Sequence, residues 1–259
     1  MLLFLARWLR IIAGWIDLLL FTLLMLALAL LPRILLQKFY PPLFHAWCRV
    51  FVRAVNVDLR LHQKNALRLP QQYILIANHP SAFEDVGVPA LFPVTSLAKI
   101  EVRDWWFVGR IAAACGTLFV QRESADSRKA ALQSIIDALQ QGKSIALYPE
   151  GGCKGRRLFT LFRYGAFEAS LATGIPILPL FIHYEAQEEF EWRDPQTLLH
   201  KLWHFVTARN NRANYYVFDA IDPHQFADQD SYSQHVYRLY LGWQKQYLEL
   251  RPFLKRKIW

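Results

Sequence analysis

The sequence has few cysteines and no cysteine pattern. Only three of its 259 residues are Cys, namely Cys48, Cys115 and Cys153, and no two of them have CxxC spacing. An odd, scattered set of this kind argues against a disulfide framework and against a thiolate metal site. It fits a protein of a reducing compartment.

Acidic residues are also scarce relative to basic ones. The chain has 21 Asp and Glu against 30 Lys and Arg, a net charge of +9, although 54% of its residues are hydrophobic. A hydrophobic and basic chain suits the anionic surface of a membrane. Nucleic acid is the alternative partner of a basic chain, but the sequence has neither zinc-finger spacing nor a base-stacking motif, so we predict no nucleic-acid partner.

One hydrophobic run is long enough to matter. From Ile11 to Leu31 the only charged residue is Asp17, and the run matches the ~20 residues that cross a bilayer. A cleaved signal peptide is the alternative, because Ala27–Ala29 has a small-x-small form. The internal acid and the apolar sequence that continues beyond it favour a retained membrane helix.

Two further segments have the character of membrane contacts. Residues 43–55 place apolar side chains at helical spacing, with Arg49 and Arg53 on the other face, which fits a helix in the membrane interface or one packed on a core. The tail, 251–259, combines basic and aromatic residues, and it is either an interfacial anchor or a solvated end. We take residues 1–56 as membrane-anchoring helices.

Residues 57–259 have the pattern of a single α/β domain without repeats or Gly/Ser linkers. A clear helical stripe spans 126–141, and an amphipathic helix covers 236–247. Strands that alternate with helices predict a mostly parallel central sheet flanked by helices. The predicted strands are 73–78, 94–99, 116–121, 144–149, 176–182 and 214–221.

The stretch LIANHPSAFEDVG, residues 75–87, ends a predicted strand in a histidine. Pro80 cannot continue the strand, and Ser81 and Glu84 have the form of a capping box with Ser81 at the N-cap. On one regular helix His79 and Glu84 would point ~140° apart. Because the helix is predicted to begin at Ser81, His79 belongs to the loop and is able to fold back onto the carboxylate.

Such a carboxylate would fix the tautomer of the imidazole and make its other nitrogen a better base. Glu84 and Asp85 also have a purely structural interpretation as acids that favour a helix N-terminus. The local sequence allows both interpretations.

Four blocks in order resemble the motifs of the glycerolipid acyltransferases, the 1-acylglycerol-3-phosphate (PlsC-like) family. Asn-His-x-Ser-x-x-acid resembles the first motif, in which four residues separate a His from an Asp. GTLFVQRES, with Arg122, is similar to the second, and LYPEGG, with Glu150 and Gly151, to the third. FRYGAFEASLATGIPILPL resembles the fourth, and Lys99 stands where the family often has a lysine. The matches span residues 72–182.

Two departures from the family pattern affect the interpretation. The acid of the first motif is Glu84, one methylene longer than Asp, and Asp85 is the alternative partner of His79. The Glu-Gly-Thr-Arg-Ser block becomes Glu150-Gly151-Gly152-Cys153-Lys154, without its arginine. Lys154 lies nearby, but a lysine is a point charge and not a bidentate fork, so an acceptor other than lysophosphatidic acid is expected.

The resemblance implies transfer of an acyl chain from acyl-CoA or acyl carrier protein to the hydroxyl of a lysophospholipid such as lysophosphatidic acid. It makes His79 the base and Glu84 its partner, with no cofactor. It also assigns substrate binding to a set of five residues. These are Lys99, Arg122, Glu150, Gly151 and Lys154. It implies an inner-membrane protein with the site facing the cytoplasm, where acyl thioesters are found.

Other readings remain open at this point. The acceptor could be another lysolipid, an aminolipid or a glycolipid, and an inactive lipid-binding relative would keep the same fold. His200 and His204 have metal-ligand spacing but lack an HExxH pattern, so we predict no metal site. The sequence has no G-x-S-x-G elbow, and the implied mechanism requires no covalent acyl-enzyme.

Overall fold

The computed structural model describes most of the chain. The described residues are 2–31, 38–121, 124–153, 155, 157–191 and 197–250. The basic and aromatic tail, residues 251–259, lies outside them, as do Arg122 and Lys154.

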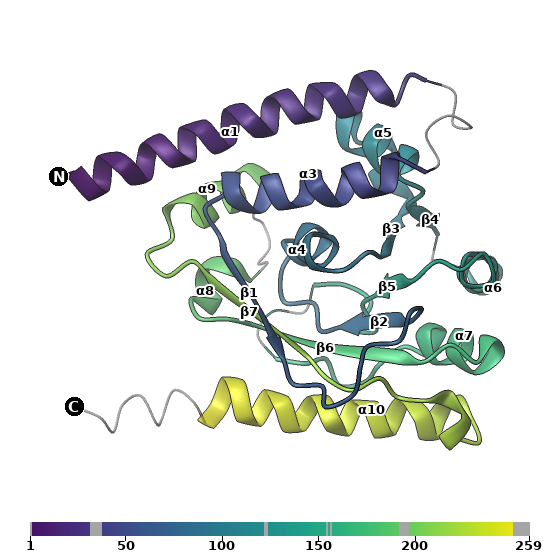
Figure 1. Ribbon diagram of the computed structural model, residues 1–259. Coiled ribbons are helices and arrows are strands. Elements are labelled where there is room, and N and C mark those ends of the chain that lie inside the picture. The colour runs from purple at the N-terminus through teal and green to yellow at the C-terminus, as the bar shows by residue number, and fades with distance from the viewer. Residues whose placement is uncertain are drawn as a thin grey trace.

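A seven-stranded sheet forms the centre of the fold, with the order β1-β7-β6-β2-β5-β3-β4 (Figure 1). Neighbouring strands run parallel except for the antiparallel pair β6–β7. The strands are β1 (Asp58–Gln63), β2 (Ile74–Ala77), β3 (Thr95–Lys99), β4 (Leu118–Val120), β5 (Ile145–Leu147), β6 (Ile177–Tyr184) and β7 (Arg212–Val217). The predicted mostly parallel α/β fold is confirmed.

Six strands coincide with predicted ones, but β1 was not predicted. Its sequence, DLRLHQ, is largely polar, and none of its residues is buried. It lies at the edge of the sheet, beside β7 alone. An edge strand of this kind lacks the apolar run by which the inner strands were recognised.

Helices cover both faces of the sheet (Figure 1). In chain order they are α1 (Leu2–Leu28), α3 (Tyr40–Ala54), α4 (Glu84–Leu91), α5 (Trp106–Ala114), α6 (Ala125–Gln140), α7 (Gly165–Thr173), α8 (Gln187–Phe190), α9 (Leu198–Thr207) and α10 (Gln229–Gln244). Short 3-10 helices span Ile100–Asp104 and Pro223–Gln225, and a π-helical turn, Lys245–Leu250, continues α10.

Two hydrophobic cores lie on the two faces of the sheet. In β2 all four residues are buried, with Leu75 and Ala77 in the core beneath α3, α4 and α9, and with Ile74 and Ile76 in the core beneath α6, α7 and α10. Successive side chains of a strand point to opposite faces. A strand covered on both sides is therefore apolar throughout, as this one is.

Helix α1 lies outside these layers and packs along α3 (Figure 1). Among its described side chains, the buried ones are Ile11, Leu18 and Met25, spaced by seven residues. At Gly14 an added Cβ would lie 3.0 Å from the Cα of Ala54, so the two helix backbones approach closely. Within the described residues, α1 alone is long and apolar enough to cross a membrane, over Leu5–Leu28.

Helix α3 is amphipathic as predicted, and its apolar face is occupied. Cys48 and Val52 belong to the core beneath it, while Arg49 and Arg53 are exposed. The indole N–H of Trp47 donates to the Thr22 hydroxyl of α1 at 2.9 Å. Helix α3 therefore joins α1 to the sheet rather than presenting its own apolar face to a membrane.

Candidate active site

The predicted site residues gather where parallel strands end. His79 follows β2, Glu150 follows its neighbour β5, and Lys99 is the last residue of β3 on the other side of β5. The carboxyl ends of parallel strands meet at one edge of a sheet, where α/β proteins commonly bind ligands. The fold thus brings together residues that are far apart in sequence.

Asn78 fixes the end of β2 just before the histidine. Its side-chain amide donates to the Ile182 carbonyl at 2.9 Å and accepts from the Ile182 N–H at 2.7 Å. Both hydrogen bonds are buried, and through them the Asn78 side chain continues the pairing of β2 with β6 beyond the last residue of β2. The loop that carries His79 therefore begins from a rigid point.

The predicted helix start at Ser81 was wrong. Helix α4 begins at Glu84, and its N-cap, Phe83, makes no side-chain capping bond. The Ser81 hydroxyl accepts from the Phe83 N–H at 3.2 Å, whereas the Glu84 carboxylate accepts from the Ser81 N–H at 2.8 Å. Only the second half of the capping box forms, and the loop curls over Glu84.

This loop conformation places His79 against Glu84. The imidazole Nδ1 lies 2.8 Å from Glu84 Oε2, and the ring stacks on Tyr148 with 4.1 Å between the ring centroids. The second carboxylate oxygen accepts from the Tyr184 hydroxyl. Asp85, the alternative partner, is exposed on α4, and the carboxylate oxygen that lies 2.8 Å from Nδ1 belongs to Glu84.

The environment of Glu84 is dry. Its side chain has no exposed surface, and burial raises the pKa of the carboxyl well above its usual range, against the hydrogen bonds from Tyr184 and Ser81, which lower it. A carboxylate at Nδ1 places the Nδ1 proton on its own side of the ring. The lone pair is then at Nε2, which is able to accept a proton.

Glu150 ties two loops together. One carboxylate oxygen accepts from the His79 N–H at 2.7 Å, and the other accepts from the Phe159 N–H at 2.8 Å. The residue is buried, and burial raises the pKa of its carboxyl. In the structure Glu150 thus acts on the backbone that positions His79, a contact that the sequence did not indicate.

Gly151 turns the chain directly after this glutamate. Its φ of +78° lies in the left-handed region, and an added Cβ would overlap the side chain of Arg163. Glycine is required on both counts. Arg163, which was not among the predicted site residues, therefore lies over this turn with its side chain exposed.

The remaining predicted binding residues are less closely placed. Lys99 is exposed at the end of β3, at the same edge of the sheet as His79. Arg122 and Lys154 lie outside the described residues.

A thiol completes the surroundings of the imidazole. Cys153 Sγ lies 3.5 Å from His79 Nε2, so the two ring nitrogens face a sulfur on one side and a carboxylate on the other. The sequence reasoning missed Cys153, Tyr148 and Tyr184 as site residues. The pairing of β2 with β5 and β6 brings Tyr148 and Cys153 to His79 and Tyr184 to Glu84. No local sequence pattern indicates such contacts.

The histidine pair on α9 makes a contact of its own. His200 Nε2 and His204 Nε2 lie 3.0 Å apart. Within the part of the chain that the structure describes, no three His, Cys, Asp or Glu side chains are grouped so that they could hold a metal ion.

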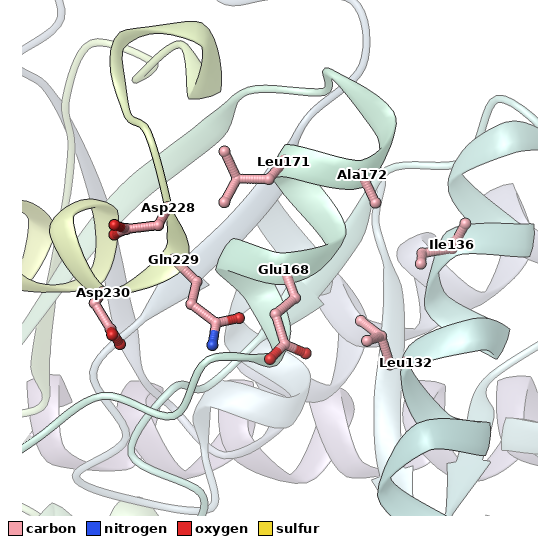
Figure 2. Close-up of a pocket in the computed structure, with 8 residues that line it drawn as sticks. All are labelled: Leu132, Ile136, Glu168, Leu171, Ala172, Asp228, Gln229 and Asp230. Carbon is pink, nitrogen blue, oxygen red and sulfur yellow. The ribbon is translucent and has the colours of Figure 1, made fainter.

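A groove of about 610 Å³ lies elsewhere, between α6, α7 and the start of α10. Figure 2 shows the carboxylates of Glu168, Asp228 and Asp230 around it, beside Leu132 and Leu171. Asp228 caps α10 by accepting from the Ser231 N–H at 2.7 Å. The lining residues belong to α6, α7 and the start of α10, whereas His79 lies between β2 and α4.

Comparison with known proteins relates part of the chain to acyltransferases. A family model described as Acyltransferase matches residues 58–183. The region of residues 58–183 is therefore similar to acyltransferase domains. The match includes His79, Glu84, Lys99, Glu150 and Cys153.

Similar proteins include several lipid acyltransferases. The domain is 34% identical to a lyso-ornithine lipid O-acyltransferase of Pseudomonas aeruginosa over 116 residues, which are 44% of this chain and 45% of that protein. It is 27% identical to a lysophosphatidylcholine acyltransferase of Drosophila melanogaster over 170 residues, which are 63% of this chain and 31% of that protein. The matches thus span less than half the length of these relatives.

The fold is that of a solved structure. The crystal structure of the 1-acyl-sn-glycerophosphate (LPA) acyltransferase PlsC from Thermotoga maritima superposes with a TM-score of 0.67 and 16% identity, over 93% of this chain and 96% of that one. The likeness extends beyond the acyltransferase domain to most of the described chain.

Proposed function

We propose that the protein transfers an acyl chain from a thioester donor, acyl-CoA or acyl carrier protein, to the hydroxyl of a lysolipid. The observation that carries this proposal is the 2.8 Å contact between His79 Nδ1 and Glu84 Oε2 in a domain of the acyltransferase family. A histidine oriented by a buried carboxylate is the arrangement with which Ser-His-Asp enzymes take the proton of a hydroxyl.

In the proposed reaction His79 Nε2 takes the proton of the attacking hydroxyl. The resulting imidazolium is stabilised by the Glu84 carboxylate, which Tyr184 and Ser81 hold in place by hydrogen bonds. Glu150 keeps the main chain of His79 in position. The imidazolium then returns its proton to the departing thiolate, so the cycle needs no cofactor.

We assign headgroup binding to the cations around this edge of the sheet. Lys99 at the end of β3 is the described candidate, and Arg122 and Lys154 follow from the motif resemblance. Gly151 and Glu150 shape the turn beneath the acceptor. A cation recognises an anionic headgroup, such as the phosphate of lysophosphatidic acid, by charge-assisted hydrogen bonds.

A second acceptor, lyso-ornithine lipid, is favoured by a specific observation. Cys153 stands where the third motif of the family has an arginine, so one phosphate-binding group is missing. The relative in Pseudomonas aeruginosa carries the name of an enzyme for that aminolipid. An acceptor without a terminal phosphate would make less use of the missing charge.

Helix α1 has one side packed on the protein and an exposed apolar side, which supports a contact with the membrane. The side with Ile11, Leu18 and Met25 packs inward, while Ile16, Leu20 and the leucines beside them are exposed. Large exposed apolar surfaces are rare on soluble proteins. We propose that this face enters the inner membrane, with the site facing the cytoplasm, and that α3 holds the domain at the bilayer surface.

An acceptor panel tests the function. The purified full chain in vesicles receives labelled palmitoyl-CoA or palmitoyl carrier protein, together with lysophosphatidic acid, lyso-ornithine lipid or lysophosphatidylcholine. The proposal predicts acylated product from at least one lysolipid, and the panel identifies donor and acceptor. Failure of every combination, while the protein is folded and vesicle-bound, would support the inactive lipid-binding relative instead.

A further inference from the structure

Cys153 occupies a catalytic position that the direct transfer mechanism does not use. Its sulfur lies 3.5 Å from His79 Nε2, the nitrogen that the proposed mechanism assigns as the base. The Glu150 carboxylate joins the loop after β5 to the main chain of His79, so the elements on both sides of this contact are held together. The fold therefore positions the thiol beside the imidazole.

The imidazole of His79 has a thiol at one ring nitrogen and a carboxylate at the other. Cys153 Sγ faces Nε2, and Glu84 Oε2 lies 2.8 Å from Nδ1. A nucleophile next to a base, with the base oriented by a third group, is the arrangement of covalent acyl-transfer enzymes on unrelated folds. Here the arrangement arises without a G-x-S-x-G elbow, from two loops that follow neighbouring parallel strands.

We propose that Cys153 is an acyl-carrying nucleophile, which takes the acyl chain from the thioester donor before the lysolipid receives it. This inference rests on the proposed acyl transfer and adds a covalent intermediate to it.

The two half-reactions balance without any further reactant. First, Sγ attacks the thioester carbonyl while Nε2 takes its proton, the bond from carbonyl carbon to donor sulfur breaks, and the imidazolium protonates the departing thiolate. The products are acyl-S-Cys153 and the donor as free thiol. Second, the lysolipid hydroxyl attacks that new thioester, gives its proton to Nε2, and the cysteine sulfur leaves and is reprotonated.

The thiol is expected to react before the lysolipid hydroxyl because it already lies beside Nε2. A hydroxyl must approach within about 3 Å of this nitrogen to lose its proton, and the thiol already lies on that side. The thiol thus reacts first with the donor, and the hydroxyl follows once acylation has engaged the sulfur. Exchange of one thioester for another forms and breaks bonds of the same kind, and the second step replaces a thioester by an ester.

The surroundings keep the resting sulfur protonated. Burial, with the negative charges of Glu84, Asp85 and Glu150, raises the pKa of the Cys153 thiol. A neutral thiol at rest depends on His79 for its activation, as a serine does in a triad. The Glu84 carboxylate, 2.8 Å from Nδ1, favours the imidazolium that forms when Nε2 takes the proton.

Mass spectrometry of the intact protein tests the intermediate directly. The full chain in detergent receives palmitoyl-CoA without acceptor, and we expect a mass increase of one palmitoyl group, located at Cys153 by peptide mapping and removed by neutral hydroxylamine. Addition of the accepting lysolipid from the panel should discharge it into product. His79→Ala should not acylate, and Cys115→Ala, a thiol away from the site, should acylate like the wild type.

Kinetics supply the second readout. Cys153→Ala should lower kcat for acyl transfer about a hundredfold or more, and the wild type should show the parallel double-reciprocal lines of a ping-pong mechanism. A folded Cys153→Ala with wild-type kcat, together with no adduct on the wild type, would overturn the inference and leave the proposed function intact. A wild type that transfers no acyl chain to any acceptor would instead overturn the proposed function.

Discussion

Replacing Glu84 by Gln removes a buried charge and changes the shape of the side chain little. The amide oxygen is able to take the place of Oε2, where it would accept from the Ser81 N–H and from His79 Nδ1 as the carboxylate does at 2.8 Å. The amide nitrogen would then face the Tyr184 hydroxyl, which has a second partner in Tyr215 at 3.4 Å. Glu84→Gln therefore tests the charge and leaves most of the geometry in place.

The expected loss of activity follows from the charge pair. During proton transfer His79 becomes positive, and two unit charges ~4 Å apart attract by about 4 kcal/mol at an effective dielectric constant of about 20. Each 1.4 kcal/mol or so of barrier is a factor of ten in rate. We therefore expect kcat to fall about a thousandfold, with the KM for the lysolipid nearly unchanged, because Glu84 does not contact the substrate.

Glu84→Gln should lose activity, but it should not lose folding stability. Burial raises the pKa of Glu84 in the folded state, so folding favours the protonated carboxyl. That contribution is complete below the pKa of the unfolded chain, about 4.3, and is lost as the pH rises through the folded-state pKa. Glu84→Gln should thus be at least as stable as the wild type at neutral pH, and the two should converge in acid.

The assay is single-turnover acyl transfer with the acceptor that the panel identifies, alongside thermal melts at pH 7 and in acid. Asp85→Asn is the matched control, since it removes an exposed carboxylate from the next residue of α4 and should change kcat by less than about threefold. Glu84→Gln within tenfold of the wild-type kcat, or a Glu84→Gln loss equalled by Asp85→Asn, would refute the proposed pair.

Three further substitutions, the last with a matched control, test the residues that hold His79 and Glu84 in position. Tyr184→Phe removes a hydrogen bond that lowers the pKa of Glu84, so the acid limb of the kcat–pH profile should move to higher pH; an unmoved limb would contradict this. Asn78→Ala leaves the buried N–H and C=O of Ile182 unpaired and should cost about 1–3 kcal/mol in urea unfolding, so an unchanged midpoint would speak against the role given to Asn78. Gly151→Ala must adopt a left-handed conformation beneath Arg163 and should cost at least about 1–2 kcal/mol. Gly152→Ala, which has open space around it, should have nearly wild-type stability, and equal losses in the two variants would contradict that explanation.

The inner strands were predictable from sequence because they are buried on both faces. β2 and β6 are apolar along almost their whole length, and such runs are conspicuous between helical stripes. β1 has no buried residue, and it pairs with β7, 154 positions further along the chain at Asp58↔Arg212. Its polar sequence does not indicate that pairing.

The contact between His79 and Glu84 was accessible for a local reason. Five positions separate the two residues, and a proline excludes a helix that would hold them apart, so a short loop was enough to bring them together. The exact loop was not accessible. The helix start depends on Glu84 accepting from Ser81 while it also contacts Tyr184, and Tyr184 is a hundred positions away.

The sequence alone did not identify Cys153 as a site residue. Among three scattered cysteines nothing marked it, and 74 positions separate it from His79. It reaches the imidazole because β2 and β5 are neighbours in the sheet and because Glu150, three residues earlier, binds the main chain of His79. Strand order, which sequence patterns do not specify, decides which loops share an active site.

The most direct measurement of the central claim is acyl transfer by His79→Ala in the same vesicles as the wild type. If the imidazole is the base, the wild type converts the accepted lysolipid and the variant loses at least about a hundredfold in kcat, with an unchanged melting temperature and unchanged vesicle binding. Transfer by a folded His79→Ala at a rate near that of the wild type would contradict the account.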